Sequence, residues 1–181
     1  MHKRCLVIVI AEDEHHEALI RRFLRECGLT RHEIRIERSP SGQGSAEHWV
    51  RKRFVIEVSV FRSRHAQTKL IVIIDADTST VHNRIRQLDQ ALPDSQKPII
   101  GTSAEQIARL VPKRNVETWI LCLNGQDVDE ETDYKGTRDD WSQQITPAAE
   151  TLFQWTRPNI QPLQCIDSLQ RGVTELKRLR F

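Results

Sequence analysis

Two stretches of the chain are apolar almost without interruption and rich in β-branched residues, which is the pattern of strands buried on both faces. They run from Cys5 to Ala11 and from Lys69 to Ile74, and both end abruptly in acidic residues. Residues 33–37 alternate between charged and apolar, which predicts a half-exposed strand near the edge of a sheet. Two shorter apolar runs, 98–100 and 107–111, are ambiguous, and the second fits either a strand or the end of a helix.

Helical patterns follow these strands. Apolar residues recur three and four positions apart, and residues that cap helices precede several of the runs. The predicted helices are 15–26, one beginning at Ser45, one capped by Asp77-Thr78-Ser79, 116–123 capped by Asn115, 146–155 and 166–179. Strands that alternate with helices predict an α/β fold, with a mostly parallel central sheet flanked by helices on both faces. We expect residues 1–125 to form this domain, and residues 126–181 to form an acidic loop and a C-terminal helical extension packed on the same domain.

Composition sets limits but does not point to a function. The chain has 181 residues, of which 38% are apolar and 29% charged, as in one ordinary globular domain. A formal net charge of +2 is too small to identify a nucleic-acid-binding protein. The first apolar run is too short for a membrane span and lacks a signal-peptide cleavage pattern, and the four cysteines are widely separated. We therefore expect a cytoplasmic protein with reduced thiols and no membrane partner.

Both strong strands end in carboxylates, Glu12-Asp13-Glu14 after the first and Asp75-Ala76-Asp77 after the second. In parallel sheets the ligand site lies at the carboxyl ends of the strands, and Asp75 and Asp77 share a side if the chain stays extended. If the two strands are neighbours, Glu12 approaches that pair, and the three carboxylates repel one another unless a cation neutralises them. Mg²⁺ suits such a site because it binds through a few carboxylates and waters. The competing interpretation is that each acid only caps the next helix.

The order of apolar strand, Glu12, helix, apolar strand and Asp75-x-Asp77 is the order of motifs in toprim domains, which residues 5–125 resemble. Toprim domains occur in topoisomerases, primases and nucleases of the overcoming-lysogenization-defect type. The resemblance implies a compact α/β fold in which Glu12, Asp75 and Asp77 organise one or two Mg²⁺ (or Mn²⁺) ions.

The chain departs from the toprim pattern at two positions. Asp13 stands where a glycine usually follows the first acid, and His16 stands where the nuclease type usually has a further acid. Glu14 or Glu17 could take the place of that acid, and we include Glu14 among the candidate metal ligands. His15 and His16 are either ligands or solvated side chains at the start of a helix, and we expect the latter.

A third cluster, residues 112–119, joins two basic residues to the start of a helix, where backbone amides and the helix dipole favour phosphate. A lysine placed after the second acidic strand is similar to the one that nuclease-type toprim domains use to stabilise the transition state. That resemblance makes Lys113 the candidate catalytic cation and Arg114 a second cation, which contacts nucleic acid. Glu117 is a candidate catalytic residue that could reach the metals, or a carboxylate that only favours the helix dipole. We expect Trp119 to lie in the core.

Two further segments bear on phosphate binding. Gly42-Gln43-Gly44 would let the backbone approach a phosphate, but the Gly-Lys-Ser/Thr of a nucleotide-binding loop is absent, so we expect an ordinary turn. A basic stretch follows, which either contacts a phosphate backbone or forms a solvated helix face. Its candidate nucleic-acid-binding residues are Arg51, Arg53, Arg62 and Arg64.

The first hypothesis from these observations is a metal-dependent nuclease that hydrolyses phosphodiesters, with DNA ahead of RNA as substrate. The resemblance also implies a context, because nucleases of the overcoming-lysogenization-defect type fuse a toprim domain to an ATPase, often in antiviral defence. A stand-alone domain would be the nuclease component of such a defence or repair system, with a separate ATPase as partner. The alternatives are a non-catalytic subunit that regulates an ATPase and a receiver-like domain phosphorylated on an aspartate. A homo-oligomer is compatible with each.

Overall fold

The chain forms a four-stranded, all-parallel sheet in the order β2-β1-β3-β4. The strands are β1 (Val7–Ala11), β2 (Ile34–Arg38), β3 (Lys69–Ile73) and β4 (Ile107–Leu110). The computed structural model describes residues 7–64, 67–97, 105–162 and 164–181, so the ambiguous run 98–100 lies outside the described residues. The other ambiguous run is strand β4, and the alternating segment is the edge strand β2. The predicted α/β fold with a parallel sheet is confirmed.

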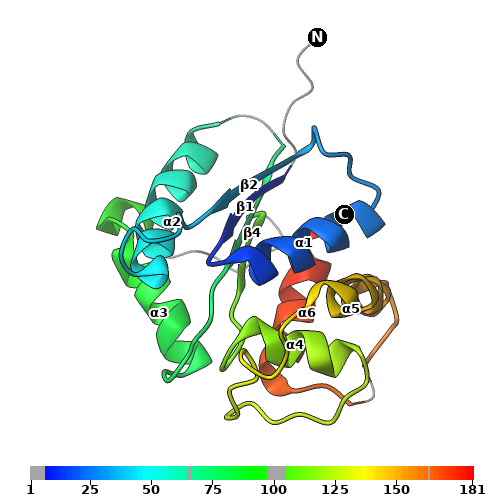
Figure 1. Ribbon diagram of the computed structural model, residues 1–181. Helices are drawn as coiled ribbons and strands as arrows, with labels where there is room; N and C mark the ends of the chain where they lie inside the picture. Colours follow the sequence, from blue (N-terminus) through cyan, green and yellow to red (C-terminus); the bar gives the residue numbers. More distant parts are fainter. Residues whose placement is uncertain (1–6, 65–66, 98–104, 163) are drawn as a thin grey trace.

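Helices cover both faces of this sheet. Figure 1 shows α2 and α3 on one face and α1, α4, α5 and α6 on the other. The helices are α1 (Glu14–Glu26), α2 (Ala46–Ser63), α3 (Val81–Ala91), α4 (Val116–Leu123), α5 (Ser142–Thr156) and α6 (Asp167–Leu179), with a 3₁₀ turn η1 (Asp94–Gln96) after α3. The largest difference from the predicted helix starts is at α5, which begins four residues early. Helix α3 is capped by Thr80, whose Oγ1 accepts from the N–H of Asn83, rather than by the predicted residues 77–79.

The central strands are apolar on both faces because each face packs against a different layer of helices. In β1, Val7 and Val9 contact the layer of α1, α4, α5 and α6, whereas Ile8 and Ile10 contact the layer of α2 and α3. Burying each of these side chains contributes about 1.5–3 kcal/mol. The continuous apolar runs in the sequence thus reflect a strand buried from two sides.

The C-terminal helices α5 and α6 belong to the same hydrophobic core as α1 and α4, on one face of the sheet. Helix α5 packs on α1 and α4, and α6 packs on β4. Trp119 is fully buried, as predicted, and its Nε1 donates a hydrogen bond of 2.8 Å to the hydroxyl of Ser168 on α6. Gly172 lies against the same ring, since a Cβ there would be 2.3 Å from Trp119 Cη2. Among the described helices, none is both long and apolar enough to cross a membrane.

The strand order creates a switch point between β1 and β3. From β1 the chain continues through α1 on one face, whereas β3 continues through α3 on the other. The two connections diverge at the carboxyl ends of these neighbouring strands. In open parallel sheets, ligands bind in the crevice at this place.

Candidate metal centre

Glu12 and Asp75 follow the two central strands and meet at the switch point. Ala11 is paired with Ile73 in the register of β1 and β3. Glu12, one residue later, therefore comes close to Asp75, two residues after Ile73. Glu12 Oε2 accepts a hydrogen bond of 2.8 Å from the backbone N–H of Asp75. Asp75 itself is only 8% exposed. The structure therefore brings together the first acid after each strong strand.

His16 completes the cluster, and the expectation that it is solvated is wrong. Its side chain, in the first turn of α1, is 0% exposed. Nδ1 lies 2.7 Å from Asp13 Oδ1, and Nε2 lies 2.8 Å from Asp75 Oδ1. One potential ligand atom each from Glu12, His16 and Asp75 lie within 4.8 Å of one another. The signal for this burial was in the sequence, because His16 precedes the buried residues of α1 at helical spacing: Leu19, Ile20 and Phe23.

Asp13 fixes the orientation of the His16 ring. As the N-cap of α1, its Oδ1 accepts hydrogen bonds from the backbone N–H groups of His15 (2.9 Å) and His16 (3.2 Å). Its Oδ2 accepts a hydrogen bond of 2.9 Å from Lys135 Nζ. A carboxylate that accepts from one ring nitrogen of a histidine determines which nitrogen faces a metal. Nε2 is therefore the ring atom presented to the other two members of the cluster.

The charges of this cluster are tightly coupled. Burial disfavours the imidazolium of His16, but the charge of Asp75 and the hydrogen bonds to Asp13 and Asp75 raise the pKa of His16 well above 6.5. Burial raises the pKa of Asp75 to about 6, although His16 acts in the opposite direction. Burial acts the same way on Asp13, but His16 and Lys135 hold the pKa of Asp13 far below its usual range. Without a metal, a proton on His16 thus offsets the repulsion between the carboxylates.

Helix α4 places a buried carboxylate beside the cluster. Glu117 is 0% exposed, and its Oε1 lies 2.5 Å from His15 Nδ1. Its other oxygen, Oε2, has no hydrogen-bond partner among the residues that the structure describes. The hydrogen bond to Glu117 raises the pKa of His15, which is partly exposed and paired rather than simply solvated. A buried oxygen without a partner costs about 1–3 kcal/mol, which favours a cation or a polar ligand near it.

Asp77 and Glu14, both predicted metal ligands, lie outside the cluster. The backbone at Asp77 has a φ of 56°, so the chain turns after Asp75 instead of staying extended. The carboxylate of Asp77 pairs with Arg114 at 3.1 Å, and the extended chain on which its shared side with Asp75 depended is not found. Aspartate accepts this left-handed conformation more readily than most residues. The side chain of Glu14 is 73% exposed, and within the described ranges its ion-pair contact is with His15, at 3.8 Å.

The acidic segment 126–140 folds back over the predicted cations. Glu131 lies 3.2 Å from Lys113 Nζ, and Asp133 lies 3.5 Å from a guanidinium nitrogen of Arg114. Both cations are therefore engaged with this segment. The segment also supplies Lys135, a site residue that sequence reasoning missed because an irregular loop carries no periodicity to place it.

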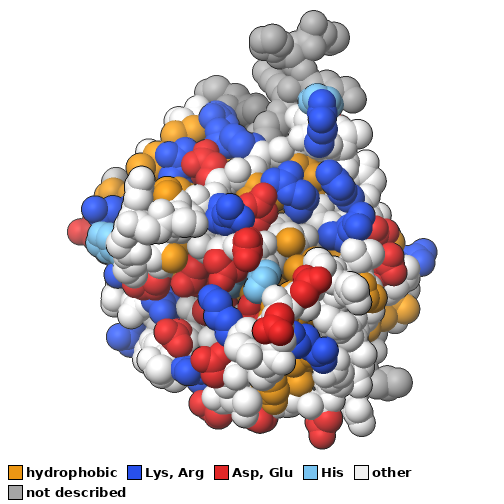
Figure 2. Space-filling view, viewed as in Figure 1, with side chains coloured by type: hydrophobic (Ala, Val, Ile, Leu, Met, Phe, Trp, Pro, Cys, Tyr) orange, Lys and Arg blue, Asp and Glu red, His pale blue; other side chains and the backbone are white. Residues whose placement is uncertain are grey.

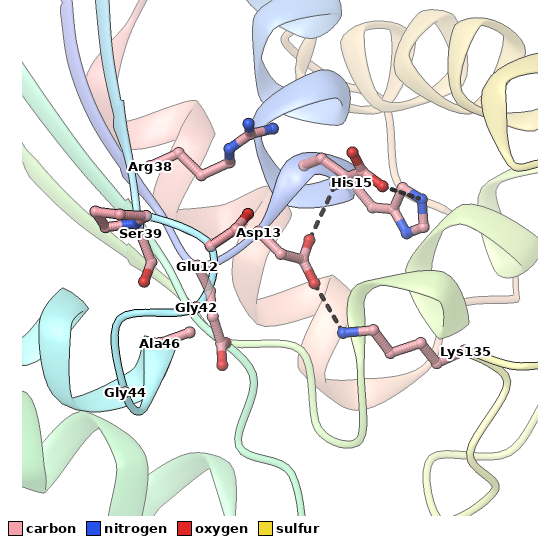
Figure 3. A pocket seen from close by; sticks show the side chains of 12 residues that line it. Glu12, Asp13, His15, Arg38, Ser39, Gly42, Gly44, Ala46 and Lys135 are labelled. Atoms are coloured by element: carbon pink, nitrogen blue, oxygen red, sulfur yellow. Dashed lines mark hydrogen bonds and ion pairs between the residues drawn. The ribbon is translucent and has the colours of Figure 1, made fainter.

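A pocket of about 360 Å³ opens beside the cluster. Glu12, Asp13 and Lys135 line it together with Arg38 and residues of the 39–46 loop (Figure 3). Gly42 and Gly44 have φ values of 75° and 81°, which glycine adopts without strain, so the predicted turn is found and it lines the pocket. Figure 2 shows acidic side chains gathered near the centre of this face, with Lys and Arg side chains around them.

The basic residues of α2 are largely engaged in ion pairs rather than forming an unpaired basic stripe. These pairs tie the helix to itself, to β2 and to the segment before β4. Arg51 pairs with Glu47, Arg53 with Glu37 and Glu57, and Arg62 with Glu105, while Arg64 is the exposed C-cap of the helix.

The donors of the cluster fit a divalent cation. Two carboxylates and one imidazole are common metal ligands. The 2.8 Å between His16 Nε2 and Asp75 Oδ1 is close to the ~3 Å that separates adjacent ligands around an ion bound at about 2.1 Å. Comparisons with protein families, with curated proteins and with solved structures found no significant match.

Proposed function

We propose that the protein is a metal-dependent nuclease, which hydrolyses phosphodiester bonds at the cluster of Glu12, His16 and Asp75. The proposal is carried by the convergence of these three donors, which come from two strand ends and one helix start. They lie beside an open pocket that is also lined by the basic side chains of Arg38 and Lys135. The sequence resemblance to toprim nucleases supports DNA as the first substrate to test and Mg²⁺ or Mn²⁺ as the metal.

A divalent cation in this cluster would polarise the phosphate and lower the pKa of bound water. Basic side chains near the cluster would bind phosphate oxygens and offset the negative charge that grows in the transition state. The resemblance gives Lys113 this role, and the place of Lys135 in the pocket makes it a second candidate.

His15 is the group best placed to handle a proton. It lines the pocket, and a hydrogen bond between its Nδ1 and Glu117 on α4 orients the ring. This hydrogen bond raises the pKa of His15, which favours the protonated ring that a general acid needs in order to give a proton to a leaving oxygen.

The test is a nuclease assay with supercoiled, linear and single-stranded DNA and with RNA, in Mg²⁺, Mn²⁺ or EDTA. Asp75→Asn keeps the side-chain shape and the backbone N–H that binds Glu12, but removes the ligand charge. We expect this variant to lose cleavage by about 10²–10³-fold, as when one strong transition-state contact is removed. Asp94→Asn is the matched control, because Asp94 has a 99% exposed side chain in η1 and should behave as wild type.

Two other outcomes identify the alternatives. Undiminished cleavage by Asp75→Asn overturns the proposal. No cleavage by the wild type, alone or with a co-encoded ATPase, favours a non-catalytic subunit of an ATPase complex. A receiver-like function is disfavoured because the carboxylate of Asp75 is nearly buried and hydrogen-bonded to His16, so a phosphodonor has little access to it. From the resemblance alone, we further propose that an ATPase partner couples the nuclease to defence or repair.

A further inference from the structure

We propose that His16 is a direct metal ligand through Nε2, and that this donor makes the centre select Mn²⁺ over Mg²⁺. The inference rests on the proposed function, because both require a divalent cation at the same cluster. It goes further in naming the ligand atom and the metal.

The ring of His16 is held in the orientation that a metal ligand needs. Its side chain is fully buried, and its Nδ1 is committed to Asp13, which is itself fixed by two backbone N–H groups and Lys135. Metal-binding histidines almost always donate their other ring N–H to a carboxylate, carbonyl or water in this way. A histidine that served only as a neutral filler of the core would need no such carboxylate on each side.

Other carboxylates cannot replace this nitrogen in the cluster. Glu14 points to solvent, and Asp77 turns toward Arg114. Asp13 is bound to Nδ1 of the ring, so Glu12 and Asp75 supply the oxygen donors that are grouped with Nε2. Glu12 uses Oε2 to accept from the backbone of Asp75, which leaves its Oε1 for a ligand bond. The resulting donor set is two oxygens and one imidazole nitrogen.

This donor set favours a first-row transition metal. Mg²⁺ is bound in proteins through carboxylates, phosphates and waters, and it gains little from a nitrogen donor. Mn²⁺ accepts the same oxygen donors and, although it stands at the weak end of the first-row series, it also binds imidazole nitrogen as a transition metal.

A second observation points to a cation at this place. Glu117 Oε2 is fully buried beside the cluster and has no hydrogen-bond partner within the described ranges. Together with Glu12, Asp13 and Asp75, Glu117 makes four carboxylates near one buried histidine, a concentration of acidic groups that favours an added cation.

The decisive measurement uses the wild-type protein loaded with Mn²⁺. Pulsed electron paramagnetic resonance detects coupling between the Mn²⁺ electrons and a directly bound ¹⁴N nucleus, and it requires no catalysis. We expect ¹⁴N coupling in the wild type, and a Kd for Mn²⁺ at least about tenfold below that for Mg²⁺ in competition titrations. Bound Mn²⁺ without ¹⁴N coupling overturns the inference but leaves the proposed hydrolysis intact, whereas no metal binding overturns both.

Three variants assign the nitrogen and test the selectivity. His16→Gln should lose the coupling, whereas His15→Gln, its neighbour in the pocket, should retain it. His16→Asp restores an acid at this position, and it should lower the Mn²⁺ to Mg²⁺ preference by about tenfold or more. Circular dichroism of each variant shows whether it is folded, and the wild-type spectrum decides the ligand even where a variant does not fold. Coupling that vanishes in His15→Gln but persists in His16→Gln overturns the proposal.

Discussion

Asp13→Asn separates the role of a metal ligand from the role of the residue that orients it. Asp13 does not belong to the group of three donors, but it accepts hydrogen bonds from His16 Nδ1 and from Lys135. Asparagine caps helices about as well as aspartate, so its side-chain oxygen can still accept from the first backbone N–H groups of α1. The substitution therefore preserves the start of the helix and removes the charge that holds the ring.

The expected loss follows from this second layer of contacts. Removing the carboxylate partner of a metal-bound histidine typically weakens metal binding 10–100-fold, which corresponds to about 1.4–2.7 kcal/mol. The ring then loses its charged acceptor on Nδ1, and Nε2 becomes a weaker base toward the cation. We expect the Kd for Mn²⁺ to rise within that range.

The assay is a titration of Mn²⁺ followed by the electron paramagnetic resonance signal of the free ion, with thermal unfolding of the same samples. Glu14→Gln is the matched control, because it removes the same charge from the next residue, whose side chain is 73% exposed and outside the cluster. An Asp13→Asn protein that binds Mn²⁺ within about threefold of the wild type would refute the role of Asp13. Weakening of equal size in Glu14→Gln would show that general electrostatics, not the hydrogen bond to His16, controls affinity.

Three further predictions test the core, the acidic segment and the proton balance. Gly172→Ala should lower the free energy of unfolding by about 1–2 kcal/mol, because overpacking against Trp119 outweighs the helix propensity that alanine gains. Urea titration measures this change, and an unchanged midpoint would contradict the prediction. Glu131→Gln should free Lys113 and tighten DNA binding by about two- to fivefold, the range of an exposed ion pair, as measured by fluorescence anisotropy at low salt; weaker or unchanged binding would show that the segment does not compete with DNA. Metal binding should release about one proton near neutral pH and should weaken as pH falls, because His16 must give up a proton that its raised pKa retains. Calorimetry in two buffers of different ionisation enthalpy measures the number of protons released. A value of zero would contradict the assignment of Nε2 as the ligand atom.

The sequence was most informative where one physical pattern dominates. The apolar runs of β1 and β3 could be predicted because both faces of these strands are buried, and the acids after them mark where the sheet ends. Strand β4 has only four residues, so its pattern could not be told from the end of a helix. Asn115 could be predicted as a cap because the contact is local: its side-chain oxygen accepts a hydrogen bond from the backbone N–H of Thr118, three residues later.

The rest of the site depends on backbone turns and on contacts between distant segments. The alternation rule placed Asp77 beside Asp75, but one residue with positive φ rotates the side chain away, and no local propensity requires that turn. Lys135 reaches Asp13 across 122 residues of sequence, from a segment without regular structure. Such contacts are decided by how the loop packs, which neither periodicity nor capping residues encode.

A histidine among the acids gives this site a property that an all-carboxylate cluster lacks. Carboxylates gathered at a buried sheet edge repel one another, and without a metal they must take up protons or separate. Here the proton is carried by His16, which lies between Asp13 and Asp75 and donates to both. The proton that folding holds on His16 contributes stability to the metal-free protein that is fully present below pH 6.5 and is lost as pH rises through the raised pKa of His16. Metal binding at neutral pH is then an exchange of one cation for another in a cluster that is already assembled, so little reorganisation opposes it.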